Sequence, residues 1–174
     1  HRIKIITLGH SDDLNTDVSR VIDGDAFRKV QERIAQLEEN EELIATKSRN
    51  GRDLPKLTIP PSAYLVSDYK KYFDEEIFGP ILQVHFVGSF SEAIDEANNT
   101  KFGLAASLIS DSRPLFDEFH SSINSGLVNF NATTTGASGA LPFGGVGKSG
   151  NYRPAGFYAA DFCAWPKSSV LKKL

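Results

Sequence analysis

The sequence predicts an α/β fold built around a parallel sheet that helices cover on both faces. Between Ile81 and Asn131 the apolar pattern alternates strand, helix, strand, helix, strand. Strands that alternate with helices are joined by right-handed crossovers, which make neighbouring strands parallel and put helices over the sheet. The 174 residues are 40% hydrophobic and 24% charged, a composition that supports one folded core or part of a larger one.

The first predicted element is a helix over residues 25–40. Its apolar stripe consists of Phe27, Val30, Ile34 and Leu37. Asp23 or Asp25 is expected to cap the first turn, because an aspartate carboxylate accepts hydrogen bonds from the free N–H groups there. The run ELIATK at 42–47 predicts a short strand, and the polar stretch KSRNGRDLP after it predicts a turn.

Two further extended segments follow. Residues 64–66 are expected to be extended because Pro60 and Pro61 exclude a helix just before them. The β-rich run ILQVHFV at 81–87 predicts a strand. After it, SFSE at 89–92 has a serine three residues before a glutamate, which is a capping box that starts a helix.

The last three elements complete the alternation. LAASLIS at 104–110 predicts a strand, and Ser112 followed by Pro114 opens a helix that is expected to end near Gly126. The apolar residues that this helix is expected to bury are Leu115, Phe116, Phe119 and Ile123. LVNFN at 127–131 predicts the third strand.

A glycine-rich segment, ATTTGASGALPFGGVGKSGNYRPAG, follows Asn131 and holds seven of the fourteen glycines. Its Gly-Lys-Ser is not a phosphate-binding P-loop, because the position that needs a glycine five residues earlier is Pro142. Gly145, Gly147 and Gly150 spell G-x-G-x-x-G, but no helix start and no later acidic residue accompany them. We therefore expect these glycines to let backbone approach backbone closely.

Four motifs identify a family resemblance. EEIFGP at 75–80, ANNTKFGLAAS at 97–107, VNFN at 128–131 and LPFGGVGKSG at 141–150 have the order and spacing of the C-terminal part of the aldehyde dehydrogenase superfamily. The chain resembles that part from about Val18 onward. The resemblance implies that residues 1–160 belong to the catalytic domain of such an enzyme. It also implies that 161–174 form a strand segment that joins a neighbouring subunit's sheet, giving a homo-oligomer.

The resemblance also implies a cofactor site. Glu76 is expected to accept hydrogen bonds from the nicotinamide-ribose hydroxyls, and Phe78 and Leu104 to contact the nicotinamide ring. From the residues alone, Glu76 would be a solvated surface acid, and Phe78 and Leu104 would be core residues. The implied cofactor is NAD+, with NADP+ as the alternative, because the residues that distinguish the two would lie outside this chain.

A substrate site is implied by TTGAS just before PFGG. In members that oxidise glutamate-derived semialdehydes, backbone amides of a Gly-Ala pair, here Gly136 and Ala137, hold the α-carboxylate. Ser138 is expected to add a hydroxyl, and Phe143 to line the aldehyde channel; a turn without a ligand is the alternative. Lys148 directly after Gly147 departs from the usual superfamily pattern. Together with the tail GNYRPAGFYAADFCAWP, it resembles the succinylglutamic semialdehyde dehydrogenases of arginine catabolism.

The catalytic groups of this family do not match any residue of the chain. The nucleophilic cysteine, the base glutamate, the oxyanion asparagine and the main nucleotide-binding domain lie upstream of the matched region. We therefore expect no catalytic residue here and no turnover by the chain alone. Cys163 is expected to be a small buried or half-buried residue. The alternative function is a non-catalytic, self-associating domain whose ligand loop is vestigial.

Composition excludes other classes. A net charge of −3 indicates neither nucleic acid nor a membrane surface as a partner. The absence of a long apolar run and of a signal peptide favours a cytoplasmic protein. The single cysteine and four scattered histidines predict no disulfide and no metal site. Methionine is absent even at position 1, which hints that the chain is part of a longer protein.

Overall fold

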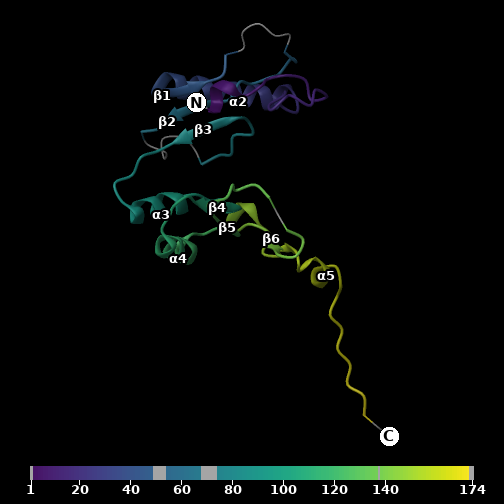
Figure 1. The fold of residues 1–174 in the computed structure, drawn as a ribbon. Helices are drawn as coiled ribbons and strands as arrows, with labels where there is room; N and C mark the ends of the chain where they lie inside the picture. Colours follow the sequence, from purple (N-terminus) through teal and green to yellow (C-terminus); the bar gives the residue numbers. More distant parts are fainter. Residues whose placement is uncertain (1, 49–53, 68–73, 137, 173–174) are drawn as a thin grey trace. The chain divides into compact units, whose positions relative to one another are not determined.

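A computed structural model describes residues 2–48, 54–67, 74–136 and 138–172 of the chain. The chain divides into two compact units, His1–Phe86 and Val87–Leu174, and each is described by itself (Figure 1). Each unit combines helices with a small sheet, which confirms the α/β class. No helix in the described ranges has both the length and the apolarity that a membrane span requires.

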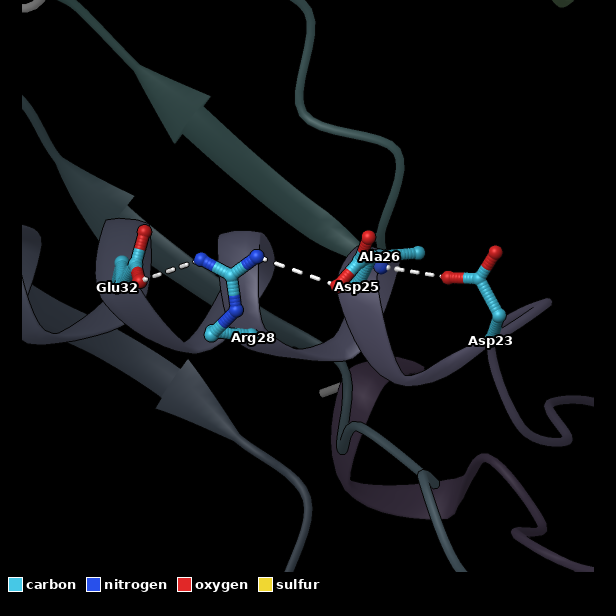
Figure 2. A network of polar contacts seen from close by, with 5 residues as sticks. All are labelled: Asp23, Asp25, Ala26, Arg28 and Glu32. Carbon is cyan, nitrogen blue, oxygen red and sulfur yellow. Dashed lines mark hydrogen bonds and ion pairs between the residues drawn. The ribbon is translucent and has the colours of Figure 1, made fainter.

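The main helix of the first unit is α2, Gly24–Asn40, as the apolar stripe predicted. Asp23 is its N-cap: the carboxylate accepts a hydrogen bond from the Ala26 N–H at 2.8 Å (Figure 2). Asp25, the other predicted cap, lies inside the helix and pairs with Arg28 at 3.2 Å, while Arg28 also reaches Glu32 at 3.4 Å (Figure 2). Because these ion pairs are exposed, each stabilises the helix only slightly.

Three strands form the sheet of the first unit in the order β1-β2-β3. They are Glu42–Thr46, Ser62–Leu65 and Ile81–Val84. The strands β2 and β3 are parallel, and their register places Ser62 opposite Ile81. In contrast, β1 runs antiparallel to β2, with an irregularity between Leu43 and Ala45, so the sheet is mixed. The alternation argument covered residues 81–131 and therefore did not reach this pairing.

The core of the first unit lies between α2 and the sheet. Leu37 of α2 packs with Tyr64 and Val66, and Ile81 packs against this cluster. Leu37 is 0% exposed and Tyr64 1%, and burying side chains of this size contributes about 1.5–3 kcal/mol each. Burial raises the pKa of the Tyr64 phenol, and the nearby negative charge of Glu38 raises it further.

The second unit begins with the helix α3, Phe90–Asn98, followed by β4, Ala105–Leu108. The helix α4, Arg113–Ser122, connects β4 to β5, Leu127–Phe130, and the two strands are parallel. All four elements were predicted. The strand expected to open this series, β3, belongs to the sheet of the first unit. The three strands predicted between 81 and 131 therefore do not form one sheet.

Side-chain caps fix the starts of α3 and α4, at Ser89 and Ser112. The Ser89 hydroxyl accepts from the Glu92 N–H at 3.1 Å, as the capping box predicted. The Glu92 carboxylate, however, accepts from the Gly88 N–H, one residue before the cap, at 2.7 Å. The helix α4 ends at Ser122, four residues before Gly126. Of its four predicted core residues, Phe119 is buried, and Leu115, Phe116 and Ile123 are half-buried.

The C-terminal region differs from its prediction. After the short ladder of β6, Pro142–Phe143, with β7, Ala155–Gly156, the chain forms a single helical turn, α5, Ala159–Phe162. The segment expected to be a strand from 161 onward therefore starts in a helix, and residues 164–172 have neither helix nor strand pairing. A strand that pairs with another subunit has no ladder within one chain, so that pairing stays a prediction. Cys163 is exposed rather than buried or half-buried, because the described residues of the unit leave it open to solvent.

Candidate functional site

A groove of about 800 Å³ in the first unit runs beside the N-terminal half of α2. We call it the α2 groove. One side is formed by α2 residues such as Lys29 and Val30, and the other by the segment Glu75–Phe78. The groove therefore contains both residues of this unit that the sequence assigned to cofactor binding, Glu76 and Phe78.

Both predicted cofactor residues in the α2 groove are accessible. Glu76 is exposed, and Phe78 presents 77% of its surface. Phe78 is therefore not a core residue of this unit, which was the alternative interpretation of its sequence position. An exposed aromatic ring beside an exposed carboxylate can contact a flat ring and a diol at the same time. The groove thus has the chemistry that a nucleoside with a planar base requires.

Two contacts that the sequence did not reveal attach the segment Glu75–Phe78 to α2. Arg33 Nη2 lies 3.6 Å from Glu75 Oε2. One residue beyond the segment, Gly79 lies so close to Val30 that an added Cβ would be 2.8 Å from its Cγ1. The indication in the sequence was the position of Arg33, three residues after Val30 and four before Leu37, which puts an arginine on the apolar face of the helix.

In the second unit, four backbone amides of the glycine-rich turn donate hydrogen bonds within the protein. The Val146 N–H donates to the Gly103 carbonyl at 2.9 Å, and the Lys148 N–H donates to the Lys101 carbonyl at 2.8 Å. The next two amides bond within the 3-10 turn η2, Gly147–Ser149, and its C-cap: Ser149 N–H to Val146 and Gly150 N–H to Gly147. Because these amides already have acceptors in the protein, they are not free to bind an anion.

The same glycines allow close backbone contacts, as the sequence predicted. A Cβ on Gly126 would overlap the carbonyl oxygen of Gly144, and a Cβ on Gly150 would overlap that of Gly145. Gly147 has φ +57°, where a side chain would also meet the carbonyl oxygen of Lys101. The turn is therefore packed against the segment 101–103. This contact brings together the motif at 97–107 and the motif at 141–150.

Leu104 follows directly after the segment 101–103. The Gly103 carbonyl accepts from both Gly126 and Val146, and the Leu104 carbonyl accepts from Leu127 at 2.9 Å. The Leu104 side chain is 43% exposed. Its backbone is thus fixed by β5 while its side chain stays accessible, and it is not the core residue that the alternative interpretation required.

The predicted substrate loop is exposed throughout the described part of 132–143. Gly136 has φ +108° and open space around it, so its conformation rather than its surroundings calls for glycine. The Ser138 hydroxyl accepts from the Ala140 N–H at 3.2 Å, which leaves its own hydrogen available to a ligand. Phe143 is 37% exposed and lies in β6. Ala137, the other predicted anchor residue, lies outside the described residues.

Side chains from β4 and β5, and from the residue after β5, tie down the start of this loop. The Ser107 hydroxyl donates to the Ala132 carbonyl at 2.6 Å, and the Asn129 amide donates to the Thr133 carbonyl at 2.7 Å. Asn131 has φ +52° and exchanges two hydrogen bonds with the Ser110 backbone. Sequence reasoning did not single out these three side chains, although Asn129 and Asn131 lie in the VNFN motif.

Comparisons with known proteins agree on one family. The aldehyde dehydrogenase family profile matches residues 1–168. An N-succinylglutamate 5-semialdehyde dehydrogenase from Sphingopyxis alaskensis is 45% identical over 151 residues, which are 86% of this chain and 31% of that enzyme. The second enzyme of that name from Caulobacter vibrioides is 56% identical over 96 residues, which are 55% of this chain and 20% of that enzyme.

A solved structure gives the same result. Betaine aldehyde dehydrogenase from Staphylococcus aureus, as a double mutant in complex with NAD+, superposes with a TM-score of 0.80 at 27% identity. The match covers 89% of this chain and 32% of that one. The chain thus spans between a fifth and a third of the length of the two curated relatives, 20% and 31%.

Proposed function

Because this chain belongs to the aldehyde dehydrogenase family, we propose that it is the C-terminal part of an NAD(P)+-dependent enzyme that oxidises N-succinylglutamate 5-semialdehyde to N-succinylglutamate. In that reaction an aldehyde, water and NAD(P)+ give a carboxylate, NAD(P)H and protons. The observation that carries the proposal is the 45% identity to an enzyme of that name over 86% of this chain. The reaction would serve arginine catabolism, as the resemblance implied.

The residues of the α2 groove suit the cofactor of this reaction. Bound NAD+ or NADP+ would supply the hydride acceptor. The exposed Glu76 carboxylate would accept hydrogen bonds from the nicotinamide-ribose hydroxyls, and the exposed Phe78 ring would pack beside the nicotinamide. Leu104, whose side chain is 43% exposed, would contact the same ring. NAD+ is our first choice, and NADP+ remains the alternative.

The loop of the second unit suits the carboxylate of the substrate. The amides of Gly136 and Ala137 would bind the α-carboxylate, and the Ser138 hydroxyl would donate to it. The left-handed backbone of Gly136 supports this role, because such a conformation turns consecutive N–H groups toward the same side. Phe143 would line the path by which the aldehyde enters.

The chain is proposed to be inactive by itself. The reaction needs a cysteine thiolate to attack the aldehyde, donors that stabilise the resulting oxyanion and a base that activates water. Cys163 is exposed on the C-terminal segment, and it does not match the position of the family's nucleophile. The catalytic groups would therefore come from the part of the enzyme that precedes this chain.

Exposed apolar side chains support the proposal that the chain contacts two partners, the preceding part of the enzyme and a second copy of the chain. In the first unit Leu82 is 55% and Phe86 78% exposed, and the preceding part of the enzyme would cover them. In the C-terminal segment Trp165 is 91% and Leu171 93% exposed, and a second copy of the chain would cover them through strand pairing. Each 100 Å² of apolar surface left uncovered forgoes about 2.5 kcal/mol, so both contacts would stabilise the protein.

Activity measurements on two proteins test the proposal. The longer protein that contains this chain should form NADH or NADPH from N-succinylglutamate 5-semialdehyde, and Glu76→Gln should raise its KM for the cofactor. The 174-residue chain alone should form none. Turnover by the chain that survives Cys163→Ala would refute the assignment of the catalytic groups. A stable assembly that binds neither the cofactor nor glutamate-like acids would favour the non-catalytic domain instead.

A further inference from the structure

Arg33 occupies an unusual position on α2. It stands three residues after Val30 and four before Leu37, which are 3% and 0% exposed, so it shares their face of the helix. Its side chain is only 12% exposed. A guanidinium that has lost this much water costs free energy unless a carboxylate pairs with it. Arg28, on the same helix, is 60% exposed and pairs within α2.

The ion pair of Arg33 leaves the helix. Its Nη2 lies 3.6 Å from Oε2 of Glu75, whose side chain is 67% exposed. Glu75 is the first residue of the segment that lines the α2 groove, and it immediately precedes Glu76. The charge on Arg33 therefore acts on the chain next to the predicted cofactor ligand.

A second contact fixes the other end of the segment. An added Cβ on Gly79 would lie 2.8 Å from Cγ1 and 2.9 Å from Cγ2 of Val30, which shows how tightly this backbone packs on α2. The Gly79 N–H also donates to the Ile77 carbonyl, and the Ile81 N–H to the Gly79 carbonyl, both at 2.8 Å. Val30 and Arg33, three residues apart on one face of α2, thus contact the residues on either side of the stretch from Glu76 to Phe78.

We propose that Arg33 is a positioning residue for cofactor binding, which acts through Glu75 to fix where Glu76 and Phe78 stand at the α2 groove. Phe78 is 77% exposed and Glu76 is exposed, so neither has packing of its own to hold it. Their placement depends on the two anchors on either side, Glu75 on Arg33 and Gly79 on Val30. The functional half of this inference rests on the proposed function, whereas the structural half does not.

Hydrogen–deuterium exchange on the 174-residue chain tests the structural half. Arg33→Gln and Glu75→Gln should each speed exchange of the amides in 75–81 by about tenfold, whereas Arg28→Gln should not. The charge-swapped pair Arg33→Glu with Glu75→Arg should restore slow exchange, which packing by the arginine stem alone does not predict. If Arg33→Gln fails to fold, the exchange of Glu75→Gln decides the test, because the Glu75 side chain is largely exposed and its replacement should not unfold the chain. Unchanged exchange would overturn the inference.

Steady-state kinetics on the longer enzyme test the functional half. Arg33→Gln and Glu75→Gln should raise the KM for NAD+ about fivefold, with no further rise in the double variant and with kcat within about twofold. Glu76→Gln is the reference. If Glu76→Gln raises that KM and Arg33→Gln does not, the positioning role is wrong and the proposed function stands. If Glu76→Gln leaves the KM for NAD+ unchanged, the assignment of Glu76 to the cofactor is wrong. The exchange experiment then still tests whether Arg33 holds Glu75.

Discussion

The segment at the α2 groove and the glycine-rich turn of the second unit are held by different kinds of contact. In the first unit, the segment at the α2 groove is attached through side chains, by Arg33 to Glu75 and by Val30 to Gly79. In the second unit, the glycine-rich turn is attached mainly through backbone, with carbonyls at Lys101 and Gly103 accepting from its amides. The Ser149 hydroxyl adds one bond, which it accepts from the Gly103 N–H.

This difference determines which substitutions each unit tolerates. A side-chain anchor can be weakened in steps, because a smaller or neutral side chain loses part of the contact and leaves the backbone in place. A backbone contact without room for a Cβ does not weaken in steps, since any side chain would push two main-chain segments apart. We therefore expect glycine substitutions in the second unit to have the largest effects on stability.

The largest expected effect is that of Gly126→Ala. Its Cβ would overlap the carbonyl oxygen of Gly144, and neither main-chain segment can move without breaking hydrogen bonds to Gly103. We expect a loss of more than about 3 kcal/mol, enough to unfold the second unit. Gly139→Ala is the matched control because nothing lies within 4 Å of its added Cβ. Urea denaturation with peptide-resolved exchange measures both, and equal stabilities would contradict the backbone-contact account.

The next effect concerns the core of the first unit. Leu37→Ala removes a side chain that is 0% exposed and packs with Tyr64 and Val66. The expected loss is about 2–5 kcal/mol, confined to exchange of amides in the first unit. Leu82→Ala, at a side chain that is 55% exposed in the same unit, should cost much less. Comparable losses for the two variants would mean that the core is elsewhere.

A smaller effect separates the two aspartates at the start of α2. Asp23→Ala removes the N-cap and leaves the Ala26 N–H without its acceptor, which should cost about 1 kcal/mol. Asp25→Ala removes an exposed ion pair with Arg28 and should cost no more than about 0.5 kcal/mol (Figure 2). Chemical denaturation of the two variants side by side gives the ranking. The reverse order would assign the cap to Asp25.

The smallest effect is a pH dependence of the first unit. Because burial raises the pKa of Tyr64 in the folded state, the unfolded chain loses this proton first as the pH rises above about 10. The folded state then binds more protons than the unfolded state, so stability falls with rising pH until the folded phenol also ionises. Tyr64→Phe should remove this part of the alkaline loss. Parallel stability curves for the two proteins between pH 9 and 12 would refute it.

The sequence by itself determined most of the local structure. The apolar stripe and Asp23 predicted α2, and the serines at 89 and 112 predicted the starts of α3 and α4. The sequence argued against a phosphate cradle at the G-x-G-x-x-G pattern, and the amides of Val146 and of residues 148–150 in that turn bond to the protein. These features depend on residues a few positions apart, so a linear pattern contains them.

Tertiary structure decided the features that join distant residues. It paired β1 antiparallel to β2, assigned β3 to the first unit and left Cys163 exposed. It also brought Arg33 to Glu75 and the Gly126 backbone to Gly144. Local patterns do not contain such contacts, because their free energy arises from burial and charge pairing between segments far apart in the chain, and only the folded backbone brings those segments together.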